Sequence, residues 1–398
     1  MLEWLRRPRG DRPFLVGEDR VWTYAETVSE VESRLVDHPL LLRPGLDPGS
    51  VFDVLAGISG GGVVVGDGSA KVNPAELPPG TKLVVFTSGT TGEPKGVRLT
   101  SGNLEAASRA SVAHLGHGSQ DRWLLAISLE HVGGLSVLIR TAYAGGSVLL
   151  LPGFEPSEFA GAMHGGVTMV SVVATMLNRV LEVDGGPYRG LRAVLVGGGP
   201  VPSGLLERAA EAGIPALPSY GMTETFGQVA TLAPGSPLEY KVHPLPGVEL
   251  RVDSDGRIAV AGDQVSPGYL GEPDRPDRWL TTNDLGEIGE DGSLRVVGRA
   301  DAVIVTGGLK VDPERVEAEL ANYPGVGDFL VFGAPDPEWG EIVVCAHTGA
   351  VESRAIETWL KERLSAHMVP KIWVRLDEIP RTSLGKPDRK ATAVLSGL

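Results

Sequence analysis

Residues 86–97 of this chain read Phe86-Thr87-Ser88-Gly89-Thr90-Thr91-Gly92-Glu93-Pro94-Lys95-Gly96-Val97, and the apolar run Leu83-Val84-Val85-Phe86 that leads into them is typical of a buried strand. Four hydroxyl side chains, three glycines and one lysine fall between residues 87 and 96. Glycines let backbone N–H groups approach an anion closely, and a lysine adds positive charge. The composition therefore predicts a loop that holds phosphate groups, with a Ser/Thr/Gly-rich surface loop as the alternative.

This loop is not the P-loop of kinases and GTPases. That motif needs a glycine directly before its lysine and a serine or threonine directly after it. Here Pro94 and Gly96 hold those positions, and the next residues, Val97-Arg98-Leu99-Thr100, predict a strand rather than a helix.

Length, charge and cysteine content exclude several classes of protein. A chain of 398 residues predicts two domains, and a formal net charge of −14 argues against a nucleic-acid partner. The single cysteine, Cys345, excludes an internal disulfide and multi-cysteine metal sites, and its apolar surroundings predict an inert strand thiol. No apolar run reaches the ~20 residues that span a bilayer, and the N-terminus lacks a signal sequence. We therefore expect a cytoplasmic protein without a membrane span.

The order of predicted elements indicates an α/β fold. Strands at 123–127, 147–151, 167–173 and 193–196 alternate with helices, among them 100–115 and a helix to Ala212 that Ser203 would cap. Such alternation predicts mostly parallel sheets flanked by helices. A turn-rich β part follows at 235–300. Asp312 and Pro313 then begin a helix in a small α+β unit, which has a further helix at 356–364. We therefore expect a large N-terminal domain, 1–300, and a small C-terminal domain, 301–398.

Residues 86–97 resemble the phosphate-loop motif of the adenylate-forming superfamily, which comprises acyl-CoA synthetases, adenylation domains and luciferases. Residues 219–225, Ser219-Tyr220-Gly221-Met222-Thr223-Glu224-Thr225, resemble the "YGxTE" motif of the same superfamily. Three later motifs follow in the expected order, at 282–286, 298–301 and 381–389, so the resemblance extends to residue 389. Compared with full-length members, the region before the phosphate loop is trimmed. The resemblance implies a small C-terminal domain that is mobile.

The resemblance assigns roles to individual residues. Tyr220 would stack on adenine, Thr223 would contact the α-phosphate, and Glu224 would bind Mg²⁺, as a hard carboxylate can. The residues implied in ATP and AMP binding are Thr87, Ser88, Gly89, Thr90, Thr91, Gly92, Lys95, Gly198, Gly199, Ser219, Tyr220, Gly221, Met222, Asp284 and Arg299. The catalytic residues would be Lys386, Thr223, Glu224 and His131, with Asp301 as the hinge and Gly307, Gly308 and Lys310 at the coenzyme A site.

Each of these residues also has a structural interpretation. His131 follows a strand, where it can be purely structural, and its neighbours Leu129-Glu130 depart from the family context. Arg299 and Asp301 can form a structural ion pair. Lys386 can be a solvated charge, and Pro387 replaces the usual aliphatic residue after it. Residues 219–225 can be an ordinary turn.

The resemblance implies that ATP, Mg²⁺ and coenzyme A are used to convert a carboxylic acid into an acyl-adenylate and then an acyl-CoA. The short length and residues 123–126, 196–200 and 298–301 look most like short bacterial o-succinylbenzoate–CoA ligases of menaquinone synthesis. Another aryl- or acyl-CoA synthetase is one alternative, and a nucleotide-binding protein without turnover is another. A homodimer is also possible.

An aromatic dicarboxylate would need a flat apolar slot and a polar group for its distal carboxylate. We expect the slot to be lined by Val172, Val173 and the three glycines Gly197, Gly198 and Gly199. Ser171 and Thr175 lie four residues apart, so they would share one helix face and donate to the distal carboxylate if the helix begins early enough, unless they bond to the backbone near the helix start. No arginine in these stretches is an obvious partner for that carboxylate.

Overall fold

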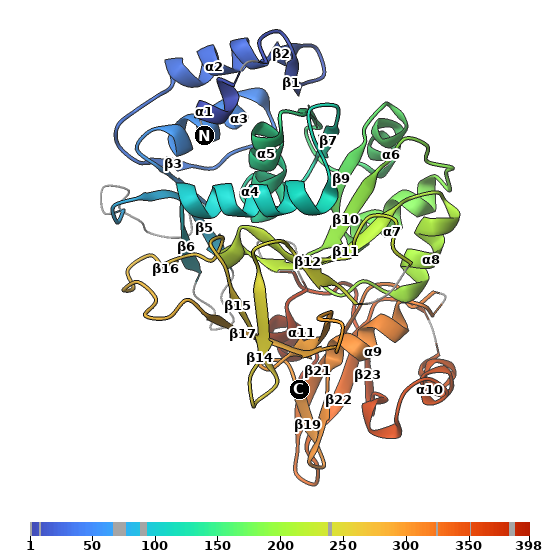
Figure 1. Cartoon of the computed structure of the whole chain (residues 1–398). Helices are drawn as coiled ribbons and strands as arrows, with labels where there is room; N and C mark the ends of the chain where they lie inside the picture. The colour runs from blue at the N-terminus through green and yellow to red at the C-terminus, as the bar shows by residue number, and fades with distance from the viewer. Residues whose placement is uncertain are drawn as a thin grey trace.

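The structure, a computed structural model, describes residues 2–7, 9–66, 77–87, 94–237, 241–323, 325–350, 352–381 and 387–398 (Figure 1). Among these residues no helix combines the length and the apolar character needed to cross a membrane.

A nine-stranded sheet forms the upper part of the molecule in Figure 1, in the order β13-β12-β11-β10-β9-β7-β8-β1-β2. The six strands from β11 to β1 in this order pair in parallel, and the outer pairs are antiparallel. The bounds are β1 Pro13–Val16, β2 Val21–Thr23, β7 Arg122–Leu125, β8 Ser147–Leu150, β9 Met169–Val173, β10 Ala193–Gly197, β11 Ala216–Met222, β12 Gly227–Thr231 and β13 His243–Pro244. The predicted parallel sheet is therefore confirmed.

Helices connect these parallel strands and bury both faces of the sheet. They are α5 (Val132–Ala144), α6 (Pro156–His164), α7 (Ala174–Val183) and α8 (Ser203–Glu211). Strand β9 shows the alternation: Met169 packs with Leu125 and Leu195, whereas Val170 packs in a second core with Leu177. The sequence predicted Ser203 as the N-cap of α8. In the structure the N-cap is Pro202, Ser203 is the first helical residue, and the N-cap makes no side-chain hydrogen bond.

A second, five-stranded sheet carries the phosphate-loop strands, in the order β16-β6-β5-β4-β3. Its strands are β3 Leu40–Leu42, β4 Val63–Val65, β5 Thr81–Thr87, β6 Lys95–Thr100 and β16 Gly268–Tyr269, and nearby lie α1 (Leu2–Leu5), α2 (Tyr24–Ser33), α3 (Pro48–Ser59) and α4 (Ser101–Leu115). β5 and β6 are antiparallel, as expected for strands on either side of a loop. Helix α4 starts with a capping box between Thr100 and Asn103.

The β-rich part is a four-stranded antiparallel sheet of β14 (Glu249–Val252), β15 (Arg257–Ala261), β17 (Leu280–Ile288) and β18 (Leu294–Arg299). A short 3₁₀ helix, η2 (Thr223–Thr225), joins β11 to β12 above it. This sheet carries the residues predicted to bind ribose.

The elements after residue 303 form a small α+β unit with hydrophobic cores of their own. They are β19 (Ile304–Thr306), β20 (Leu309–Val311), α9 (Pro313–Leu320), β21 (Phe329–Asp336), β22 (Gly340–His347), α10 (Ser353–Lys361), η3 (Ala366–Met368), β23 (Ile372–Arg375) and α11 (Arg389–Leu395). Asp312 caps α9 as predicted, and Cys345 is buried in β22. The unit lies at the bottom of Figure 1, and the predicted fold class of a large α/β part and a small α+β part is confirmed. The boundary at residues 300 and 301 stays a prediction.

Candidate active site

Thr87 and Lys95 lie opposite each other where β5 ends and β6 begins. The Thr87 hydroxyl donates a 3.4 Å hydrogen bond to the carbonyl oxygen of Lys95. The other predicted loop residues, Ser88, Gly89, Thr90, Thr91 and Gly92, lie outside the described residues. The structure thus fixes both ends of the predicted phosphate loop.

Tyr220, Asp284 and Arg299 come together from three strands, β11, β17 and β18. The Tyr220 hydroxyl donates to Asp284 Oδ2 at 2.8 Å, and an Arg299 nitrogen donates to Asp284 Oδ1 at 3.2 Å. Burial and the Asp284 carboxylate raise the pKa of Tyr220, so this hydroxyl stays protonated and remains a donor. Arg299 also donates two bonds to Asp301, which raise its pKa. The ion pair considered as a structural alternative therefore exists, and it is joined to the predicted ribose residue.

The glycine turn after β10 lies beside this group. Gly197 lies next to the carbonyl oxygen of Ser219, and Gly198, which Gly199 follows, lies next to Val173. The Ser219 hydroxyl is 2.8 Å from that of Thr231. Gly221 pairs so closely with β12 that a Cβ atom there would lie 2.1 Å from the carbonyl oxygen of Gly227. Residues 219–225 are therefore a strand end, through Met222, and a 3₁₀ turn from Thr223, with a backbone spacing that requires glycine.

Glu224 is held by Tyr269, which the sequence did not single out. The Tyr269 hydroxyl donates to Glu224 Oε1 at 2.9 Å. Among the described residues no group of three or more His, Cys, Asp or Glu side chains could form a complete metal site. Mg²⁺ bound to phosphates needs only one or two protein carboxylates, so a single oriented Glu224 fits this ion.

The expected acyl-pocket residues are arranged differently from the prediction. Helix α7 begins at Ala174, so Ser171 lies in β9 and cannot share a helix face with Thr175. Val172 and Val173 point to opposite faces of the sheet, because side chains alternate along a strand: Val172 is buried in the core with Leu177, whereas Val173 lies beside Gly198. The Ser171 hydroxyl is buried and has no hydrogen-bond partner within the described part of the chain. The slot can thus include Val173 and Ser171 but not Val172.

His131 is the N-cap residue of α5, with extended backbone and no side-chain capping bond. Its backbone N–H donates to the carbonyl oxygen of Ser128 at 3.2 Å. The helix therefore begins at Val132, directly after His131, and the role of the His131 side chain stays a prediction.

The same helix carries Arg140, a buried charge that sequence reasoning missed. Arg140 is only 5% exposed, and no carboxylate in the described structure pairs with it. It donates to Gln228 Oε1 at 2.8 Å, to the backbone oxygen of Ser136 at 2.8 Å and to the Ser136 hydroxyl. Burial lowers its pKa to about 9. A charged residue within the apolar run of residues 135–142 was the signal that could have revealed it.

Arg140 lines a small polar cavity that also touches the turn into β12. The cavity is about 10 Å³, room for about one water molecule, and its lining includes Ser111, Ser136, Phe226 and Gln228. Phe226 and Gln228 directly follow η2, which carries Glu224, so this cavity adjoins the turn that follows β11, the strand of Tyr220.

The predicted coenzyme A and lysine residues belong to the C-terminal unit. Gly307 and Gly308 form the turn between β19 and β20, where the Gly307 N–H donates to the carbonyl oxygen of Trp339, and Lys310 is exposed on β20. Lys386 lies outside the described residues. Arg381 and Pro387 pair as an isolated β-bridge, so the two ends of the segment with Lys386 lie together.

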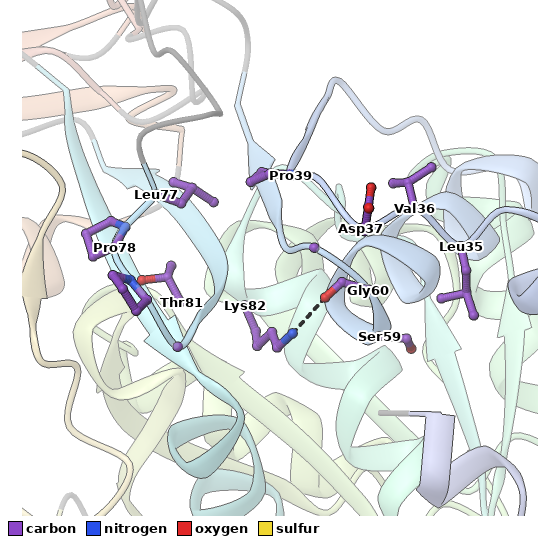
Figure 2. Close-up of a pocket in the computed structure, with 13 residues that line it drawn as sticks. Leu35, Val36, Asp37, Pro39, Ser59, Gly60, Leu77, Pro78, Thr81 and Lys82 are labelled. Carbon is purple, nitrogen blue, oxygen red and sulfur yellow. Dashed lines mark hydrogen bonds between the residues drawn. The ribbon is translucent and has the colours of Figure 1, made fainter.

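A wide hollow of about 780 Å³ lies elsewhere, between the ends of α2 and α3 and strand β5 (Figure 2). Its lining is largely apolar, and the one lysine that lines it, Lys82, donates to the carbonyl oxygen of Gly60 at 2.6 Å. None of the predicted site residues that the structure describes lines it.

Comparison with family models gives two matches. The AMP-binding enzyme family matches residues 61–270, and the AMP-binding enzyme C-terminal domain matches residues 315–386. The 2-succinylbenzoate–CoA ligase of Bacillus cereus is 37% identical over 326 residues, which are 76% of this chain and 67% of that protein.

Solved structures of o-succinylbenzoate coenzyme A synthetase from Bacillus subtilis are also similar, at 28% identity over 98% of this chain. The complex with AMP has a TM-score of 0.88 and is covered over 97% of its length. The complex with the acyl-adenylate intermediate OSB-AMP has a TM-score of 0.87 and is covered over 96% of its length. The complex with ATP and magnesium has a TM-score of 0.86 and is covered over 98% of its length. A double mutant of that enzyme bound to the product analogue OSB-NCoA has a TM-score of 0.70. It is 28% identical to this chain, and the match covers 99% of this chain and 97% of the mutant.

Proposed function

Because the chain belongs to the family of AMP-binding enzymes, we propose that it is a carboxylate–CoA ligase that activates its acid as an acyl-adenylate. The observation that carries this proposal is the group in which Tyr220 and Arg299 fix the Asp284 carboxylate. A carboxylate held in this way can accept hydrogen bonds from both hydroxyls of a ribose.

The residues would divide the adenylation step between them. Asp284 and Arg299 hold the ribose, Tyr220 packs against the adenine, and Thr223 donates to the α-phosphate. The loop from Thr87 to Lys95 holds the β- and γ-phosphates, which leave as pyrophosphate when the substrate carboxylate attacks the α-phosphorus. Glu224 holds Mg²⁺, which supplies charge neutralisation when bound. Lys386 provides a positive charge between the attacking oxygen and the α-phosphate, where preorganised charge stabilises the transition state.

The second step needs a thiol in place of pyrophosphate. We propose that Asp301 is the hinge about which the C-terminal unit turns, bringing Gly307, Gly308 and Lys310 to the acyl-adenylate. The coenzyme A thiol then attacks the acyl carbon, and AMP leaves.

We propose that the acid is o-succinylbenzoate. Two observations support this proposal: the similar proteins are named as ligases for this acid, and Arg140 is a buried cation. A buried cation among neutral acceptors lacks the opposite charge that would compensate its desolvation. The distal carboxylate of a dicarboxylic acid can supply that charge, either directly or through a water molecule in the cavity. Benzoate and fatty acids have no such second carboxylate.

The test is product analysis with purified protein, ATP, Mg²⁺ and o-succinylbenzoate. Without coenzyme A we expect pyrophosphate release and an acyl-adenylate detectable by mass spectrometry, and with coenzyme A we expect acyl-CoA and AMP. Omitting the acid should abolish pyrophosphate release. ATP binding without acid-dependent pyrophosphate release, for o-succinylbenzoate and a panel of aromatic and aliphatic acids, would instead indicate a nucleotide-binding protein without turnover.

A further inference from the structure

Tyr269 lies between two parts of the site that are far apart in sequence. It belongs to the two-residue strand β16, which pairs antiparallel with β6 and sets Tyr269 opposite Val97. Because β6 begins at Lys95, this pairing brings the tyrosine beside the end of the phosphate loop.

The hydroxyl of Tyr269 contacts the carboxylate of Glu224, the residue predicted to bind Mg²⁺. It donates to Glu224 Oε1 at 2.9 Å, while the Ser266 N–H donates to the backbone oxygen of Glu224 at 2.7 Å. One oxygen and the backbone of Glu224 are thereby fixed by the loop around β16.

The ring of Tyr269 contacts the lysine. Lys95 Nζ lies 5.0 Å from the ring centroid, within the range of a cation–π interaction, and 3.6 Å from Glu272 Oε1. The Glu272 N–H donates to the carbonyl oxygen of Tyr269 at 3.2 Å. The ammonium group therefore lies between the aromatic ring and a carboxylate held by the same short loop.

We propose that Tyr269 is a positioning residue that keeps Glu224 and Lys95 apart, so that the metal-bound triphosphate of ATP can lie between them. Without a spacer the glutamate and the lysine would attract each other and form an ion pair that competes with the ligand. Tyr269 engages Glu224 through its hydroxyl and Lys95 through its ring, and so it separates the two charges. This inference rests on the proposed function, since it assumes that Glu224 binds Mg²⁺ and that Lys95 binds phosphate.

Calorimetry on Tyr269→Phe tests the inference, because the substitution removes the hydroxyl and keeps the ring. We expect the Kd for ATP with Mg²⁺ to rise about tenfold, the size typical of losing a residue that orients a metal ligand. The Kd for ATP with EDTA and that for AMP should change less than about twofold, since neither complex involves the metal. Tyr188→Phe is a matched control, because the Tyr188 hydroxyl contacts Asp184, which is not a predicted site residue. This variant should bind all three ligands like wild type.

Three results would overturn the inference, and they are distinguishable. An unchanged Kd for Mg²⁺·ATP in Tyr269→Phe rejects it while the proposed function stands. Equal losses for Mg²⁺·ATP, ATP with EDTA and AMP show that Tyr269 only supports the fold. Wild-type protein that binds neither Mg²⁺·ATP nor AMP rejects the proposed function, and the inference with it.

Discussion

At Arg140 a positive charge lies in the interior of the N-terminal part, and the acceptors of its hydrogen bonds among the described residues are neutral. Gln228 and Ser136 accept its hydrogen bonds, its guanidinium carbon lies 5.0 Å from the centroid of the Trp123 ring, and burial lowers its pKa. Arginine suits a carboxylate partner because its planar group can donate two parallel bonds. We therefore propose that this residue determines the specificity for a dicarboxylate.

Arg140→Lys tests that assignment with the charge retained and the planar geometry lost. We expect kcat/KM for o-succinylbenzoate to fall about 10- to 100-fold, because one bidentate contact to a charged group is worth about 1.5–3 kcal/mol. The value for benzoate should change little. Steady-state kinetics with both acids measures the ratio of kcat/KM for o-succinylbenzoate to kcat/KM for benzoate.

Arg192→Lys is the control, since Arg192 makes a structural ion pair with the buried Asp121. It should lower the midpoint of thermal unfolding without changing the ratio between the two acids. A loss of activity in Arg140→Lys that is equal for the two acids would remove this arginine from substrate recognition.

Strand β18 and the segment after it connect the nucleotide site to the C-terminal unit. β18 ends at Arg299, which bonds to both Asp284 and Asp301, and β19 begins at Ile304. Asp312, the cap of α9, packs against β18 at Gly298, and burial there raises its pKa to about 6. The start of α9 and Asp301 thus both contact strand β18 of the predicted ribose site, which is where the proposed rotation would be controlled.

Asp301→Pro should separate the two half-reactions. Proline fixes φ near −65° and would hold one arrangement of the C-terminal unit. We expect one half-reaction, measured as pyrophosphate release or acyl transfer to coenzyme A, to be retained and the other to fall sharply. Asp301→Ala removes the ion pair but leaves φ free, so both steps should continue. If the proline variant slows both steps by the same factor, Asp301 is not a hinge.

Local patterns in the sequence sufficed for the elements that hold the site. The apolar run before Thr87 predicted β5, and Thr100 with Asn103 predicted the start of α4. The strand predicted at 167–173, followed by a helix, agrees with β9 and α7, so the earlier helix start that would bring Ser171 onto the face of Thr175 does not occur. Tyr269 was missed because a two-residue strand has no periodicity, and its partners Glu224 and Lys95 are distant in sequence.

For the whole molecule, membership of the adenylate-forming family is confirmed, along with the α/β architecture that was predicted with it. The roles of the individual site residues, the boundary at 300, a homodimer and a cytoplasmic location stay predictions. Family motifs report the shared chemistry of adenylation well, because the nucleotide is the same throughout. They report the acid poorly, since the pocket that we propose for it includes Arg140, which lies outside those motifs.

The central claim is that this chain activates o-succinylbenzoate. Its most direct test is a comparison of kcat/KM for o-succinylbenzoate, benzoate and a medium-chain fatty acid under identical concentrations of ATP, Mg²⁺ and coenzyme A. We expect o-succinylbenzoate to exceed benzoate by at least about 10²-fold, because a site with a buried polar group rejects an analogue that leaves this group unpaired. An equal or higher kcat/KM for benzoate or for the fatty acid would contradict the account.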